Sequence, residues 1–393
     1  MRNRRIVVPS SVGLSALLAV TALILVRPAW FWSNPVPGPV MSGQAVFDGP
    51  VVGSGGHTLT RLATRTALLV EPSKVPAAER AALGHAIGSP VPSRGSYLWM
   101  APASVRRLWT HRVPALQRVR IQIWIPQPGV PIGVLSAAAA ASHAMTRGPW
   151  SLEHGIYQIA ATSPTVRLDL DGQLSHALSQ AVGDRGAVVV LSRRGQWIGA
   201  AGSQKGAIWQ GRPVGMAGLP PLLAWALADK KVASKVNKEA LSLSQMAALW
   251  GTGGLMRALH TLGYATGRIG FSPDPNPALP TLPSAVFSSG TGLRATPLEL
   301  AQSFLPFVGS PARVAMQGAP ARARRLSDQV SKTLREVLDQ MPSVTLNGMS
   351  YRIWRPAGDY AVIIAPELRE VAVLEGAAVE RTMSVVQILG EKL

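Results

Sequence analysis

Four short apolar runs in the second half of the chain constrain its fold most. Two of them, 186–191 and 197–201, are separated by a short polar turn and predict a β-hairpin. The other two, 359–364 and 370–374, lie near the C-terminus and predict a second pair of adjacent strands. Helical patterns dominate between the pairs, from about 220 to 262. Strands at both ends of a region with helices between them predict one antiparallel sheet packed with helices, an α+β domain.

Further elements are expected on both sides of this pattern. Alternation predicts strands at 66–70, 119–125 and 166–170, and helical spacing predicts helices at 76–87, 174–182 and 382–389. The alanine run 137–141 is compatible with a helix but is of low complexity.

An uncharged stretch of 21 residues lies close to the N-terminus, from Ile6 to Val26, and has the length of one bilayer span. Arg2, Arg4 and Arg5 precede it, and the aromatic residues 30–32 follow it. By the positive-inside rule these flanks predict a single-pass membrane anchor with a cytoplasmic N-terminus and the remainder of the chain extracytoplasmic. The alternative is a cleaved signal peptide, but the apolar core is long for one and no small-residue cleavage site follows it.

The composition limits the classes of function. The chain of 393 residues is 47% hydrophobic and 15% charged, which indicates a folded protein large enough for two globular domains. It contains no cysteine, so disulfides, thiolate metal sites and a cysteine nucleophile are excluded. Its net charge of +19 is compatible with a solvated basic surface or with attraction to a polyanion such as lipid or an anionic wall polymer. No nucleic-acid-binding signature is present, so nucleic acid is not an expected partner.

Five segments, in this order, carry a resemblance to a known family. They are Gly148-Pro-Trp-Ser-Leu-Glu-His-Gly-Ile-Tyr157, Val166-Arg-Leu-Asp-Leu-Asp171, the hairpin 185–201, Ser288-Ser-Gly-Thr-Gly-Leu-Arg-Ala-Thr-Pro-Leu-Glu-Leu-Ala-Gln302 and Gly358-Asp-Tyr-Ala-Val-Ile-Ile-Ala-Pro366. Together they resemble class B penicillin-binding proteins, the membrane-anchored D,D-transpeptidases that cross-link peptidoglycan. Hydropathy predicts a cytoplasmic stub and anchor at 1–32, and the Pro/Gly content predicts a linker at 33–56. The resemblance implies a pedestal-like domain at 57–160 and a transpeptidase-like domain at 161–393.

The nucleophile motif of that family is Ser-x-x-Lys at the start of a helix, where desolvation lets the amine take the hydroxyl proton. The matching frame here is Pro213-Val-Gly-Met-Ala-Gly-Leu-Pro-Pro221, with Met216 in the place of the serine and Leu219 in that of the lysine. Neither side chain can transfer a proton. No serine lies three residues before any lysine of the chain, so no shift of register restores the motif.

The two other motifs of the family are also altered. The counterpart of Ser-x-Asn is Ser244-Gln-Met246, which keeps the serine and loses the asparagine. The resemblance places Lys-Thr-Gly on an edge strand shortly before Tyr360, where the segment 346–354 contains no lysine. Arg352 is either a substitute for the lost positive charge or an ordinary surface arginine. The site residues Met216, Leu219 and Met246 therefore predict an apolar cleft with no catalytic group retained.

No replacement chemistry is visible in the sequence. The seven histidines lack metal-ligand spacing, and no Gly-x-Ser-x-Gly elbow occurs. The glycine turns 251–254 and 290–292 lack the Gly-Lys-Ser/Thr of a phosphate-binding loop. We expect neither a metal nor a cofactor.

Three functions stay open at this point. The first is a membrane-anchored pseudoenzyme with a structural or regulatory role in peptidoglycan synthesis or cell division, whose partner is a polytopic glycan polymerase or another division or wall-synthesis protein. The second is an active transpeptidase with a divergent site. The third is a basic anchor protein that binds anionic wall polymers.

Overall fold

The computed structural model describes residues 40–41, 47, 49–88, 91, 95–144, 150–159, 165–202, 208, 211–238, 241–264, 283–289, 293–309, 326–356, 359–368, 370–376 and 379–391. The chain divides into two compact units that are interleaved along the sequence. The first takes Met1–Gln44, Thr64–Gln122 and Gly148–Ala161, and the second takes Ala45–Ala63, Ile123–Arg147 and Thr162–Leu393. The predicted boundaries after residues 32, 56 and 160 remain predictions.

The predicted membrane span, Ile6–Val26, lies outside the residues that the structure describes. Among the described residues, no helix combines the length and the apolar character that crossing a bilayer requires.

The first unit is built on a six-stranded sheet with the order β1-β4-β3-β5-β7-β6. Trp99 and Trp109 meet edge to face in its core, with ring centroids 6.1 Å apart. The elements of this sheet and the helices beside it are β1 (Val40–Met41), β3 (Thr60–Val70), η3 (Pro72–Lys74), α2 (Ala77–Ile87), β4 (Tyr97–Met100), α3 (Ala103–Arg112), β5 (Gln117–Pro126), β6 (Trp150–Glu153) and β7 (Ile156–Ile159), of which β3 and β5 extend into residues of the second unit.

The second unit contains a strand at each of the four predicted apolar runs, 186–191, 197–201, 359–364 and 370–374, together with further strands and helices. In chain order they are β2 (Val51–Val52), η2 (Ser54–Gly56), α4 (Ile132–Ala144), β8 (Val166–Arg167), α5 (Gly172–Val182), η4 (Gly183–Arg185), β9 (Ala187–Ser192), β10 (Trp197–Gly202), β11 (Arg212–Pro213), η6 (Gly215–Gly218), α6 (Leu219–Ala228), α7 (Lys230–Val236), α8 (Leu243–Leu262), α9 (Pro283–Ser289), β12 (Arg294–Ala295), α10 (Pro297–Phe304), η7 (Leu305–Val308), α11 (Asp328–Asp339), β13 (Ser343–Leu346), β14 (Met349–Trp354), β15 (Tyr360–Ala365), β16 (Glu370–Glu375) and α12 (Val379–Glu391).

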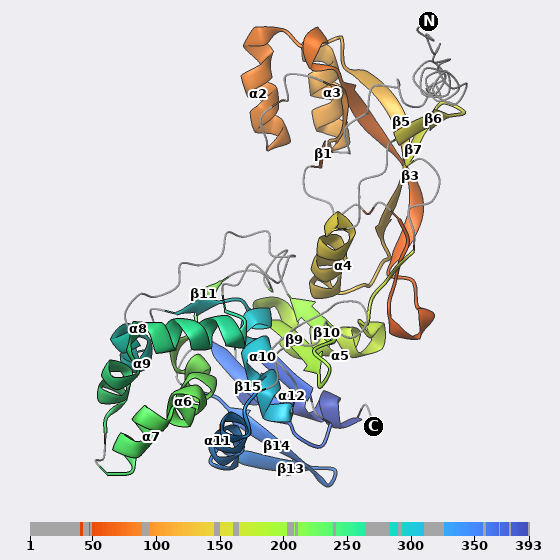
Figure 1. The fold of residues 1–393 in the computed structure, drawn as a ribbon. Coiled ribbons are helices and arrows are strands. Elements are labelled where there is room, and N and C mark those ends of the chain that lie inside the picture. Colours follow the sequence, from red (N-terminus) through yellow and green to blue (C-terminus); the bar gives the residue numbers. More distant parts are fainter. Residues whose placement is uncertain are drawn as a thin grey trace, which may run out of the picture. The chain divides into compact units, whose positions relative to one another are not determined.

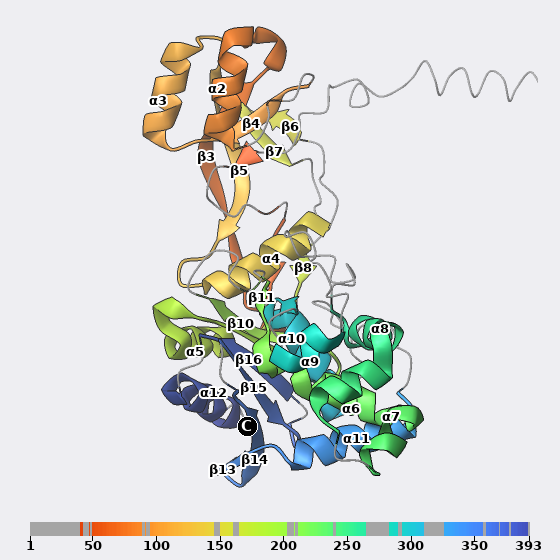
Figure 2. The same ribbon diagram turned by 90° about the vertical axis from the view of Figure 1, so that its left-hand side faces the viewer.

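Its central sheet is antiparallel throughout and has the order β10-β9-β16-β15-β14-β13 (Figure 1). Alternate residues of each inner strand enter different cores, as the two-residue period of a strand requires. Val188 and Val190 pack with α5 and α12, whereas Val189 and Leu191 pack with α6, α8 and α10. The sheet therefore lies between a two-helix layer and a larger helical layer (Figure 2). This arrangement confirms the predicted mixed α+β fold with an antiparallel sheet.

Side-chain caps fix where the helices around the sheet begin. Asp171 accepts hydrogen bonds from the amides of the first turn of α5. Ser242 with Gln245 at α8, and Thr296 with Glu299 at α10, form capping boxes, in which two otherwise unpaired amides are satisfied reciprocally. The strand predicted at 166–170 is shorter in the structure, where β8 pairs with the two residues of β2 and ends at Arg167.

Candidate functional site

The frame that carries Met216 and Leu219 forms the start of helix α6. Met216 lies in the turn η6, and Leu219 is the first residue of α6, followed by two prolines in its first turn. The position before this turn is fixed, because the amide of Val214 donates to the carbonyl of Leu293 at 2.8 Å and β11 pairs with β12. The structure thus brings the start of the frame 213–221 beside residues 293–295.

An indole lies against the position where the nucleophile would be expected. Trp354, at the end of β14, donates its Nε1 hydrogen to the carbonyl oxygen of Met216 at 3.0 Å. Both side chains are half-buried and pack on the same apolar core, while Leu219 is buried with 9% of its surface exposed. Neither Met216, Leu219 nor Trp354 has a group that could act as a general base at neutral pH. The side chains at the start of α6 therefore pack on the apolar core and offer no group for acid–base catalysis.

The two residues at the positions of the second motif, Ser244 and Met246, have different environments in α8. Ser242 is the N-cap, so Ser244 lies in the first turn, where its side chain is exposed. Met246 faces the interior with 5% of its surface exposed. Within the described ranges, no hydrogen bond links Ser244 to the start of α6. The prediction that Met216, Leu219 and Met246 line one apolar cleft remains a prediction, although all three lie on elements of the same helical layer.

The expectation that the third motif lies on an edge strand is wrong. Its segment forms β14, which pairs with β15 on one side and with β13 on the other. Asn347 and Gly348 connect β13 to β14 with φ values of 52° and 78°, the conformation of a tight hairpin turn that favours an Asn-Gly pair. The Asn-Gly pair between alternating residues was the sequence signal for this hairpin, and sequence analysis missed it. An extended ligand cannot pair with residues 349–352 of β14 on this side, because β13 already does.

Arg352 is occupied by the C-terminal end of α11. Its Nη1 donates to the carbonyl oxygens of Asp339 and Met341 at 3.4 and 3.3 Å, and its Nη2 lies 3.5 Å from the Asp339 carboxylate. These contacts favour the reading of Arg352 as a structural residue over that of a receptor for a substrate carboxylate.

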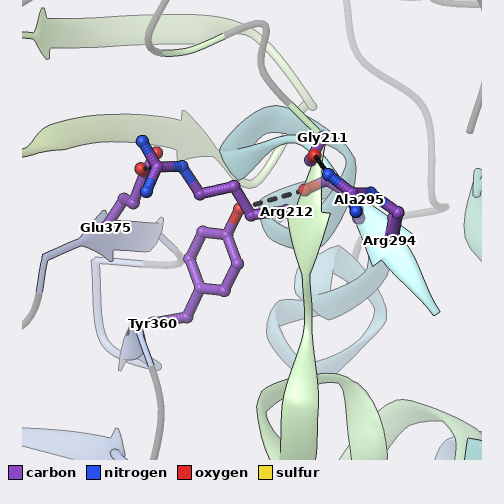
Figure 3. Close-up of polar contacts among 6 residues, drawn as sticks. All are labelled: Gly211, Arg212, Arg294, Ala295, Tyr360 and Glu375. Carbon is purple, nitrogen blue, oxygen red and sulfur yellow. Dashed lines mark hydrogen bonds and ion pairs between the residues drawn. The ribbon is translucent and has the colours of Figure 1, made fainter. Parts of the chain in front are cut away.

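A polar cluster lies where the β11–β12 ladder meets the central sheet (Figure 3). Arg212 pairs with the Glu375 carboxylate at 2.6 Å, and Arg294 donates to the carbonyl of Gly211 at 2.8 Å. The buried Tyr360 hydroxyl donates to the carbonyl of Ala295 at 3.0 Å. The contacts of Arg212 with Glu375 and of Tyr360 with Ala295 thus link the β11–β12 ladder to the central sheet.

Burial sets the protonation states of this cluster. It raises the pKa of the Tyr360 phenol far above its ordinary value, and the neighbouring Glu375 raises it further, so the hydroxyl stays a donor. Burial also raises the pKa of the Glu375 carboxyl, with Arg212 opposing and Asp359 adding to the effect. Both groups stabilise the contact between the two ladders. The Glu375 side chain is 6% exposed and pairs with Arg212, and the Tyr360 hydroxyl donates its hydrogen bond to a backbone carbonyl.

The remaining sequence candidates do not assemble into a site. The glycines 251–254 lie inside α8, and the turn 290–292 falls outside the described residues. Among the residues that the structure describes, no three histidine, aspartate or glutamate side chains cluster in a way that could hold a metal ion.

Comparisons with known proteins give a coarse structural likeness and no match by sequence. No protein-family profile matches the chain, and no curated protein matches it by sequence. Among solved structures, the chain is similar to one from a peptidoglycan synthase complex, described as the structural coordination of polymerization and crosslinking. The two share 14% identity over 97% of this chain and 96% of the other, with a TM-score of 0.49. A likeness of this size does not assign a family.

Proposed function

We propose that this protein is a catalytically inactive, membrane-anchored relative of the class B penicillin-binding proteins that acts by binding within the peptidoglycan synthesis or cell-division machinery. The observation that carries the proposal is the start of α6, where a methionine replaces the expected nucleophile and the Trp354 indole is bonded to its carbonyl. Acyl transfer needs a nucleophile and a nearby base, and the Met216–Leu219 turn supplies neither.

Two further features support a binding role. The hairpin β13–β14 occupies the strand edge along which a peptide could otherwise pair, so recognition of a substrate strand at this place is blocked. The segments that carry the family resemblance include β9, β10, β15 and most of α10, which belong to the central sheet and its larger helical layer. A glycan polymerase or another wall-synthesis or division protein is the partner class that this role implies, by analogy with the family.

The test is covalent labelling by a fluorescent penicillin. Membranes containing the full chain are incubated with the probe beside membranes containing an active transpeptidase, and labelled bands are resolved on a denaturing gel. We expect no labelled band at the mass of this chain. A band that disappears after Met216→Ala or another change within 213–221 would instead establish an active enzyme with a divergent site.

Partner binding is tested separately. The full chain is captured from detergent-solubilised membranes of its own host, and the co-purifying proteins are identified by mass spectrometry. Recovery of a polytopic membrane glycan polymerase, or of another wall-synthesis or division protein, supports the proposal. Recovery of none of these in stoichiometric amount contradicts it.

The net charge of +19 favours one competing function, an anchor for anionic wall polymers. Screening weakens exposed charge interactions as ionic strength rises. Binding of the chain to isolated cell wall that falls steeply between low and physiological salt, and is unchanged by Met216→Ala, would favour this alternative.

A further inference from the structure

A cavity of about 460 Å³ lies in the helical layer of the second unit, away from the Met216 turn. Helix α6 packs against both α8 and α11, and these helices provide most of the lining. The residues that line the cavity are Trp225, Ala228, Asp229, Trp250, Gly254, Arg257, Ala258, Thr261, Leu326, Ser327 and Val330. Its volume falls within the range of about 300–1,000 Å³ that is typical of small-molecule sites.

Two tryptophans form aromatic walls of the cavity, and the backbone of α8 is built to hold one of them. Gly251 interrupts α8 directly after Trp250 with a φ of 70°, a conformation that favours glycine. At Gly254 an added Cβ would lie only 2.5 Å from Cδ1 of Trp250. Phe287 meets the same indole edge to face, with centroids 5.8 Å apart. The glycine segment that has no role as a phosphate loop thus positions a wall of the cavity.

Unpaired hydrogen-bond donors outnumber unpaired acceptors around this cavity. The exposed guanidinium of Arg257 has no ion pair among the described residues. The indole Nε1 of Trp225 is buried and lacks an acceptor in the same part of the chain. A buried donor without an acceptor is unfavourable, so a ligand oxygen that reached it would be favoured.

The other polar groups of the lining are already used by the fold. Thr261 donates to the carbonyl of Arg257 at 2.8 Å, and the hydroxyl of Ser327 caps α11. Asp229 accepts from the amide of Lys231 at 2.9 Å through Oδ1, which leaves Oδ2 as the carboxylate oxygen of the lining without a partner among the described residues.

We propose that this cavity binds an amphipathic organic carboxylate, with an apolar or aromatic body between Trp225 and Trp250 and the carboxylate on Arg257. Arginine is suited to carboxylates because its planar guanidinium can offer two parallel hydrogen bonds. The apolar walls contributed by Ala228, Ala258 and Val330 bury the body of such a ligand, whereas a purely polar anion would lose its hydration there without replacement. Asp229 repels the carboxylate and so orients it towards Arg257.

The test measures binding of 2-naphthoate to the full chain in lipid nanodiscs by equilibrium dialysis, with empty nanodiscs as the blank. Naphthalene-2-methanol, which has the same body and no charge, is the reference ligand. We expect saturable binding of 2-naphthoate that is at least ten-fold tighter than that of the alcohol. Equal affinity of the two, or no saturable binding, would overturn the proposal.

Three variants locate the site. Arg257→Gln is expected to weaken 2-naphthoate binding about ten-fold, the effect of losing roughly 1.4 kcal/mol. Arg335→Gln, at an exposed arginine on α11 outside the lining, is the matched control and is expected to leave affinity unchanged. Asp229→Asn keeps the helix cap and removes the repelling charge, so it is expected to tighten binding. Equal affinities of Arg257→Gln and Arg335→Gln, or weaker binding of Asp229→Asn, would contradict the proposal.

Discussion

At the scale of single residues, Trp354 is the side chain that contacts the position of the missing nucleophile. Its indole hydrogen bond to the Met216 carbonyl ties the end of β14 to the start of α6. Sequence reasoning identified Met216 and Leu219 from their frame, but it could not find Trp354, whose contact spans 138 positions along the chain. Long-range contacts of this kind depend on the tertiary fold and leave no local pattern.

Replacing Trp354 by phenylalanine keeps an aromatic ring and removes the donor. We expect Trp354→Phe to lower the free energy of unfolding by about 1 kcal/mol, the net value of one hydrogen bond. The matched control is Trp225→Phe, since the Trp225 indole is also half-buried but has no acceptor among the described residues. Urea unfolding of both variants provides the measurement. An equal or larger loss in Trp225→Phe would contradict the assigned role of the Trp354 hydrogen bond.

Glu375 gives a pH prediction because burial raises the pKa of its carboxyl above the ordinary value of 4.5. Between that value and the higher pKa of the folded state, the folded protein binds more protons at this group than the unfolded chain. This group therefore stabilises the fold increasingly as pH falls through the folded-state pKa towards 4.5, and the gain is constant below it.

Glu375→Gln removes this titration. Paired urea unfolding from pH 7 to pH 4 should show the wild-type protein gaining stability relative to the variant as pH falls, with the change complete near pH 4.5. A stability difference that is independent of pH would show that the carboxyl titrates normally in the folded protein.

At the scale of elements, the sequence predicted the inner strands well and the β13–β14 hairpin not at all. The inner strands are apolar on both faces or alternate clearly, because they separate two cores. Strand β13 alternates polar and apolar residues, Ser343-Val-Thr-Leu346, but it is four residues long and none of them is fully buried, so its pattern is a weak signal. The sequence therefore predicted an edge strand shortly before Tyr360, whereas β14 has a neighbouring strand on each side in the structure.

Two glycines test how the backbone shapes these elements. Gly348 has a φ of 78° in the hairpin turn, so Gly348→Ala should destabilise the protein by about 1 kcal/mol through backbone strain. Gly253 is an exposed residue of α8 and an added Cβ would meet no atom within 4 Å, so Gly253→Ala should stabilise the protein by about 0.5–1 kcal/mol. Thermal unfolding of both variants measures the shifts. Shifts of the same sign would contradict the assigned backbone conformations.

At the scale of the whole molecule, the chain combines a proposed membrane anchor with two compact units. The anchor prediction rests on residues 6–26 and their flanking charges and aromatics. We expect the full chain to stay in the membrane pellet after alkaline carbonate extraction, while a chain that begins at Ser33 does not. Intact-mass measurement of the pelleted protein distinguishes the uncleaved anchor from a signal peptide. Extraction of the full chain to the same extent as the shortened one would contradict the anchor.

The central claim concerns acyl transfer, and the mass of the intact protein tests it most directly. The full chain is incubated with excess benzylpenicillin, and its mass is compared with that of an untreated sample and of an active transpeptidase treated in parallel. We expect the mass of this chain to stay unchanged while the active enzyme gains one covalent adduct. A stoichiometric adduct on this chain that is lost when Met216 is replaced by alanine would contradict the claim that the site at the start of α6 is inactive.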